Sequence, residues 1–131
     1  MSRTQEETYG EIVDMRELLR HVPSPLTQDS VFVDVGSGYG RFALYVALAT
    51  PCRRVVGIEL HEGRHAVADK RREAEKVAHL RFERGDVRTL GLPRHATHLY
   101  MASTCFRQKL CDDIVALAPP RLVSIITLKQ I

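Results

Sequence analysis

The sequence lacks the features that mark several common protein classes. It has no tryptophan, no internal repeat, no low-complexity tract and no signal peptide, and none of its apolar runs approaches the ~18 residues of a membrane span. These absences exclude membrane insertion and favour a soluble protein that is not exported.

Cysteine is also scarce. Cys52, Cys105 and Cys111 are odd in number and show no C-x-x-C spacing. We expect reduced intracellular thiols that pack as small apolar side chains. The remaining composition, 131 residues with 44% apolar content, predicts one compact α/β domain over residues 1–131.

The net charge is only +3, which is too small to indicate a nucleic-acid partner and leaves direct nucleic-acid binding undecided. Much of the positive charge lies in residues 64–76, where arginine and lysine alternate with acids at helical spacing. This pattern predicts a helix with one solvated face.

The most informative segment is the sequence VFVDVGSGYG, residues 31–40. Its apolar, β-branched beginning predicts a strand of a parallel sheet that is buried on both faces. Gly36, Gly38 and Gly40 then predict a turn, and the run from Arg41 to Thr50 predicts a helix. A strand, a glycine turn and a helix N-terminus would place unpaired N–H groups beside a bound molecule.

The spacing in this segment separates two kinds of ligand. The third glycine comes one residue earlier than in the dinucleotide fingerprint G-x-G-x-x-G, and Asp34 stands two residues before the first glycine. A carboxylate at this position would repel a pyrophosphate and suits a cofactor with a cationic end. The plainer alternative is a turn that only packs the helix against the strand.

A second acid follows at the end of the next predicted strand, residues 53–59. Glu59 lies twenty-five residues after Asp34, where the second strand of a βαβ unit ends. Its two oxygens can accept hydrogen bonds from both hydroxyls of a ribose. A cap on the following helix is compatible with this role. A third acid, Asp86, follows Gly85 after a short strand around Phe82.

Strands and helices alternate along the chain. We expect an amphipathic helix over residues 11–20, then the strand at 31–35, the helix at 41–50, the strand at 53–59, a helix, the short strand around Phe82, a loop, a strand at 97–101, a helix at 109–118 and a strand at 121–128. This order predicts a doubly wound, Rossmann-like parallel sheet of about five strands, with ligands at the carboxyl ends of the strands.

A competing motif lies directly after Glu59. The sequence His61-Glu62-Gly63-Arg64-His65 matches H-E-x-x-H, which on a helix places two imidazoles on one face for zinc. Against a zinc peptidase, the helix is charge-rich and a glycine and an arginine separate the histidines. Glu83 is the conceivable third ligand. We expect no metal and keep the peptidase as a remote alternative.

The motifs D-x-G-S-G-x-G, VVGIE and FERGDVR, together with Thr8-Tyr9-Gly10-Glu11 before the first helix, resemble those of the class I S-adenosylmethionine-dependent methyltransferases. They are most similar to the Dot one-like (disruptor of telomeric silencing) family of non-SET histone-lysine methyltransferases. The resemblance covers nearly the whole chain and implies S-adenosylmethionine as the cofactor. The cofactor-binding residues that it implies are Tyr9, Glu11, Asp34, Gly36, Ser37, Gly38, Gly40, Glu59, Leu60, Asp86 and Val87.

The resemblance also assigns roles within this set. It places Asp34 near the amino end of the cofactor, Asp86 at the exocyclic amine of adenine and Val87 beside the ring. It makes residues 1–25 a lid and helix, with Tyr9 and Glu11 over the methionyl end, and residues 26–131 the sheet core. The plainer interpretation of Tyr9 and Glu11 is a helix entry with an acid in the first turn.

For the reaction, the resemblance implies a lysine channel near Tyr9 and residues 102–106. Ser103 and Thr104 can offer oxygen acceptors to the amine, and Tyr9, Tyr39 and Phe106 are the candidates for an aromatic wall. The family's Asn-Asn-Phe stretch is replaced here by the sequence ASTCF, residues 102–106, which weakens the case for a histone substrate. The plainer interpretation is a loop in which Ser103 or Thr104 caps the next helix. The chain also stops at Ile131, so we expect a minimal fold in which the C-terminal hairpin of the complete class I sheet is missing.

The expected function is therefore an S-adenosylmethionine-dependent N-methyltransferase that acts on a lysine amine of a protein, with a histone or nucleosome as the implied partner. We expect it to be intracellular, and nuclear if the substrate is a histone but cytoplasmic otherwise, with no membrane partner. The alternatives are a non-catalytic S-adenosylmethionine-binding module and one part of a split methyltransferase.

Overall fold

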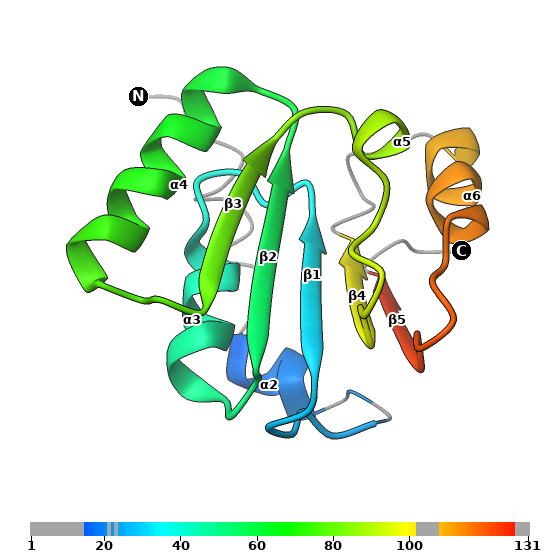
Figure 1. Ribbon diagram of the computed structural model, residues 1–131, viewed down its shortest axis with the longest axis horizontal. Helices are drawn as coiled ribbons and strands as arrows, with labels where there is room; N and C mark the ends of the chain where they lie inside the picture. The colour runs from blue at the N-terminus through cyan, green and yellow to red at the C-terminus, as the bar shows by residue number, and fades with distance from the viewer. Residues whose placement is uncertain (1–14, 21, 23, 102–107, 128–131) are drawn as a thin grey trace.

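The chain forms a five-stranded parallel sheet with helices on both faces (Figure 1). The computed structural model describes residues 15–20, 22, 24–101 and 108–127. The strand order is β3-β2-β1-β4-β5, and all four strand pairs are parallel. The strands are β1 (Val31–Val35), β2 (Arg54–Glu59), β3 (Leu80–Arg84), β4 (His98–Met101) and β5 (Ser124–Thr127). This arrangement confirms the predicted doubly wound, Rossmann-like class.

The helices divide between the two faces of the sheet (Figure 1). One face is covered by α2 (Met15–Arg20), α3 (Arg41–Ala49) and α4 (Glu62–Glu75), and the other by α5 (Val87–Leu90) and α6 (Gln108–Ala116). The strands run so that their carboxyl ends share one edge, the upper edge in Figure 1. Ligands of such folds bind at this edge.

Strand β1 lies at the centre of the sheet and is buried along its whole length. Phe32 packs on the α3 side, where its ring meets Phe42 edge-on at 5.9 Å, while Val33 and Val35 pack in the cluster on the α5 and α6 side. Burial on both faces explains why the sequence here is continuously apolar rather than alternating. Asp34 interrupts that run on the same face as Phe32, because side chains alternate along a strand.

The element order agrees with the sequence prediction except in one place. The segment predicted as a loop between the third and fourth strands contains the single helical turn α5. Asp86 is its N-cap and accepts a hydrogen bond from the N–H of Arg88, which is the local signal that the turn prediction missed. Helix α4 is solvated as expected, since Ala68 is its one buried residue.

Two of the three cysteines lie within the described residues, and both are buried and free. Burial raises the pKa of the Cys52 thiol, which makes it an inert packing residue. Cys105 lies outside the described residues. Within those residues, no helix combines the length and the apolar character needed to cross a bilayer.

Candidate functional site

Two carboxylates lie at the carboxyl edge of the sheet, on neighbouring strands. Asp34 near the end of β1 is 2% exposed, and Glu59 at the end of β2 is 5% exposed. Asp34 is the register partner of Gly57, and Gly57 and Glu59 share one face of β2 because side chains alternate. Both acids therefore project on the α3 and α4 side of the sheet. Burying two acids together costs free energy unless hydrogen-bond donors or a cation offset their charge.

The glycine turn between β1 and α3 is fastened to β2 by backbone hydrogen bonds. The N–H groups of Gly36 and Ser37 both donate to the carbonyl oxygen of Ile58, at 2.8 and 3.0 Å. The N–H of Gly38 donates to Oε1 of Glu59 at 2.8 Å, and that of Gly40 donates to the Ser37 carbonyl at 3.0 Å. The prediction of unpaired N–H groups is thus wrong at these four positions, because three of the N–H groups bond to β2 and the fourth bonds within the turn.

Two glycines of the turn differ in what surrounds them. Gly40 has φ +85°, and an added Cβ would lie 2.7 Å from the Phe82 ring and 2.8 Å from Cβ of Ala68. Gly38 has φ +59°, and an added Cβ would have no atom of the described residues within 4 Å. Gly40 is therefore required by packing, whereas no described residue fills the space beside Gly38, where a ligand can approach the backbone.

Gly57 in the middle of β2 is a residue that the sequence analysis did not single out. A Cβ added there would come within 2.5 Å of the Phe82 ring and 2.9 Å of Cβ of Ser37. The missing side chain lets the turn settle against the sheet beside Asp34. A glycine inside an apolar strand is the signal that marks such a close approach.

The Glu59 carboxylate is held by three donors of the chain itself. Oε1 accepts from the N–H of Gly38, and Oε2 accepts from the N–H of His61 at 2.9 Å and from Nε of Arg64 at 3.2 Å. Because each carboxylate oxygen has two acceptor positions, Oε1 retains one for a ligand. A hydroxyl pair that uses both oxygens would have to displace Arg64 or His61 from Oε2. Like Gly57, Arg64 is a residue of the site that the sequence analysis did not identify, here as a hydrogen-bond donor to Glu59.

Asp34 has the opposite environment. Its Oδ1 atom and the hydroxyl of Ser37 are buried without a hydrogen-bond partner among the described residues. Burial, and next the negative charge of Glu59, raise the pKa of Asp34 to about 7. A buried carboxyl with an unused oxygen calls for a donor from outside, and a cationic donor would satisfy both its hydrogen bonding and its charge.

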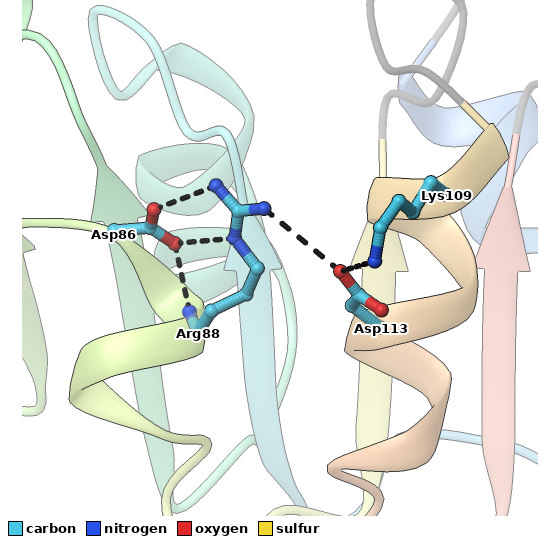
Figure 2. Close-up of polar contacts among 4 residues, drawn as sticks. All are labelled: Asp86, Arg88, Lys109 and Asp113. Carbon is cyan, nitrogen blue, oxygen red and sulfur yellow. Dashed lines mark hydrogen bonds and ion pairs between the residues drawn. The ribbon is translucent and has the colours of Figure 1, made fainter.

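The third predicted acid is engaged by an arginine (Figure 2). Arg88 donates to Asp86 from its backbone N–H (2.9 Å) and Nε (3.1 Å) to Oδ1, and from Nη2 (2.9 Å) to Oδ2. These bonds lower the pKa of the Asp86 carboxyl. Arg88 also lies 3.8 Å from Asp113, which Lys109 contacts at 3.4 Å, so the pair is linked to α6. Oδ2 accepts a single bond and keeps room for another donor.

The histidines of the H-E-x-x-H motif have structural contacts. Nδ1 of His61 accepts from the N–H of Arg64 as the N-cap of α4, at 3.3 Å. Nε2 of His65 lies 3.2 Å from the carbonyl oxygen of Phe82, so it is the donor. Glu83 instead pairs with Arg81 at 2.7 Å. No group of three or more potential metal ligands occurs within the described residues.

A cavity of about 670 Å³ opens at the start of α4, directly after Glu59 in the sequence. It is lined by Leu60, His61, Glu62, Gly63 and Arg64, the residues that join β2 to α4. Leu60 is 64% exposed, which leaves an apolar surface beside Glu59 free for a planar group. Val87, by contrast, is 5% exposed and packs in the core cluster on the α5 and α6 side.

Of the predicted site residues, Asp34, the glycine turn, Glu59, Leu60 and Asp86 lie along the carboxyl edge of the sheet, whereas the Val87 side chain is buried in the core beside that edge. The remaining predicted site residues lie outside the described residues. They are Tyr9, Glu11, Ser103, Thr104 and Phe106.

Several solved structures with a similar fold are methyltransferases in complex with S-adenosylmethionine or S-adenosylhomocysteine. Phosphoethanolamine N-methyltransferase 2 of Haemonchus contortus, in complex with S-adenosyl-L-methionine, superimposes with a TM-score of 0.70 at 21% identity, over 85% of this chain and 27% of that chain. Geranyl diphosphate C-methyltransferase of Streptomyces coelicolor A3(2) gives 0.68 at 19%, over 82% and 40%. A methyltransferase of Thiobacillus denitrificans in complex with S-adenosyl-L-homocysteine gives 0.62 at 18%, over 91% and 47%.

The chain therefore spans 27–47% of the length of these structures, and at such identities the likeness establishes the fold. A comparison with curated proteins finds no match. A family profile described as histone methylation protein DOT1 matches residues 2–87, well over half of the 131 residues and the whole segment from the glycine turn to Asp86. The chain belongs to this DOT1 family.

Proposed function

We propose that the chain binds S-adenosylmethionine at the carboxyl ends of β1 and β2 and acts as a methyltransferase on a lysine amine of a protein. The observation that carries the proposal is the pair of buried acids beside the glycine turn, one held by three donors and the other with an unused oxygen. S-adenosylmethionine carries a sulfonium, an ammonium group and two ribose hydroxyls, which can supply a donor and positive charge to Asp34 and a further donor to Glu59.

The described residues fit the parts of this ligand. Oε1 of Glu59 offers a charged acceptor to a ribose hydroxyl, and exposed Leu60 offers apolar contact to adenine. Oδ2 of Asp86 can accept from the adenine amine while Arg88 keeps its other bonds. Asp34 and the open space beside Gly38 remain for the methionyl end.

When bound, S-adenosylmethionine supplies a methyl group that is already activated by the sulfonium. The residues of the chain need only hold it in place and keep water away, since methyl transfer is mainly a task of positioning. The family description favours a histone or nucleosome as the substrate, and with such a substrate the protein works in the nucleus. Tyr9, Ser103, Thr104 and Phe106 remain our candidates for the lysine channel.

The first test is calorimetric titration with S-adenosylhomocysteine. We expect one site, and we expect Glu59→Gln to weaken binding about 10- to 100-fold, because the variant exchanges a charged acceptor for a neutral amide. The matched control is Glu83→Gln, which removes a carboxylate from the neighbouring strand β3, where it pairs with Arg81. Equal affinities of the two variants, or no binding by the unaltered chain, would contradict the proposal.

The second test is methyl transfer from labelled S-adenosylmethionine to histones, nucleosomes and free peptides. Labelled lysine on a histone or nucleosome supports the substrate assignment. Binding of S-adenosylhomocysteine without transfer to any of these would instead favour the non-catalytic module or the split enzyme, and would refute the catalytic part of the proposal for this chain.

A further inference from the structure

We propose that Arg64 determines how strongly the site selects a ribose with two free hydroxyls. Its guanidinium occupies the acceptor position on Glu59 that a second hydroxyl needs, and it leaves that position when both hydroxyls bind. This inference rests on the proposed S-adenosylmethionine site and adds to it a specificity-determining residue.

The argument begins with the acceptor positions of the Glu59 carboxylate, two on each oxygen. The N–H of Gly38 uses one position on Oε1, and the N–H of His61 and Nε of Arg64 use both positions on Oε2. One position on Oε1 is therefore free. Because a ribose presents two neighbouring hydroxyls, the second can reach Oε2 only if one of the present donors leaves.

Arg64 is the donor that can leave. The N–H of Gly38 belongs to the turn that is fastened to β2, and the N–H of His61 belongs to the N-cap of α4. The His61 carbonyl oxygen also accepts from the N–H of His65 at 3.0 Å, which fixes this backbone further. Arg64 instead donates from a flexible side chain that is 39% exposed, at 3.2 Å, the longest of the three bonds. Its departure from Glu59 requires no movement of the backbone.

The surroundings of Arg64 allow this exchange. Arg64 lines the cavity of about 670 Å³ together with residues 60–63. Within the part of the chain that the structure describes, its Nη groups have no hydrogen-bond or ion-pair partner, so the Nε bond alone ties the guanidinium to Glu59. A half-exposed ion pair contributes little free energy, whereas a hydroxyl bonded to a buried carboxylate contributes more. The exchange therefore favours the ribose, at a reduced net affinity.

The consequence concerns the selectivity of the site. A ligand that lacks the second hydroxyl leaves Arg64 on Oε2, and the retained ion pair offsets part of the missing hydroxyl bond. The unaltered chain should therefore discriminate only weakly against a deoxyribose. In a variant without the guanidinium nothing offsets the missing bond, and the discrimination should increase.

The first experiment is calorimetric titration of the unaltered chain and of Arg64→Ala, at pH 8, with S-adenosylhomocysteine and its 2′-deoxy and 3′-deoxy analogues. Relative to S-adenosylhomocysteine, we expect the analogue without the hydroxyl that meets Oε2 to lose about fivefold more affinity on the variant than on the unaltered chain. A purely structural role of Arg64 would weaken all three ligands by one factor and leave their ratios unchanged.

The matched control is Arg84→Ala. Arg84 on β3 is the register partner of Glu59 and is exposed, and it makes no hydrogen bond or ion pair with that carboxylate. Its removal takes away a positive charge at a similar place in the sheet. The ratios among the three ligands should stay as they are on the unaltered chain.

The second experiment uses the unaltered chain alone, so it does not depend on the folding of a variant. Nitrogen-15 NMR follows the exchange of the Arg64 Nε–H with water. We expect this exchange to become faster when S-adenosylhomocysteine binds, and to stay as slow as in the free protein with the analogue that leaves Oε2 to Arg64.

Equal ligand ratios on the unaltered chain and on Arg64→Ala would overturn this inference, and so would an Nε–H that exchanges no faster in the S-adenosylhomocysteine complex. Either result leaves the proposed function standing, because the cofactor still binds. No binding of S-adenosylhomocysteine by the unaltered chain overturns both.

Discussion

Gly40→Ala is expected to lower the melting temperature by ~10 °C, because the substitution combines backbone strain with overpacking. Gly40 is the N-cap of α3 at φ +85°, in the left-handed region that costs an alanine about 1–2 kcal/mol. The added methyl group would also lie 2.7 Å from the Phe82 ring and 2.8 Å from Ala68, and overpacking of this kind costs about 1–3 kcal/mol.

Gly38→Ala is the matched control for this prediction. It imposes the same kind of backbone strain, at φ +59°, but the new methyl group meets no described atom within 4 Å. We expect a loss of ~1 kcal/mol of unfolding free energy. Thermal and urea unfolding followed by circular dichroism measure both variants. A Gly40 variant no less stable than the Gly38 variant would mean that Phe82 and α4 do not pack on the turn as described.

Asp34→Asn is expected to stabilise the ligand-free protein increasingly as the pH rises. The pKa of Asp34 is raised to about 7, so between pH ~4 and pH ~7 the folded chain holds a proton that the unfolded chain has released. Where the folded state binds more protons, stability falls with increasing pH. The unaltered protein therefore loses stability through this window, while an uncharged asparagine loses none.

The stability difference between the Asn variant and the unaltered chain should grow by about 2–3 kcal/mol from pH 5 to pH 8. Urea unfolding at several pH values measures it, because other titrating groups cancel between the two proteins. Asp29→Asn, from an exposed position, should show no such widening. A constant difference for Asp34→Asn would indicate that the buried carboxyl has found a donor that keeps it charged.

The fold was predictable because its signals are local. The apolar run of β1, the glycine turn and the acids at the strand ends each lie within about ten residues, and the alternation of strands and helices then limits the topology to few choices. The prediction missed the helical turn α5, although Asp86 is a favourable N-cap residue, because four residues are too short for a periodic pattern.

The site was predictable as a set of positions but not as a network of bonds. The sequence analysis identified Asp34 and Glu59. It did not predict that backbone N–H groups of the turn donate to acceptors on β2, or that Arg64 donates to Glu59. These contacts depend on the angle at which α4 leaves β2 and on the space that Gly57 provides. Such features are set by packing between segments distant in sequence, which a local pattern does not contain.

The strand order has a consequence for how the molecule forms during synthesis. Asp34, the glycine turn and Glu59 all belong to β1, α3 and β2, which pair over short sequence separations, whereas β1 must wait for His98–Met101 to gain its other neighbour. As the chain leaves the ribosome, both acids and the turn are therefore synthesised before β4, the strand that pairs with the second edge of β1. The bonds from Gly38, His61 and Arg64 to Glu59 require no residue beyond the first turn of α4, whereas the core on both faces of β1 requires residues of β4.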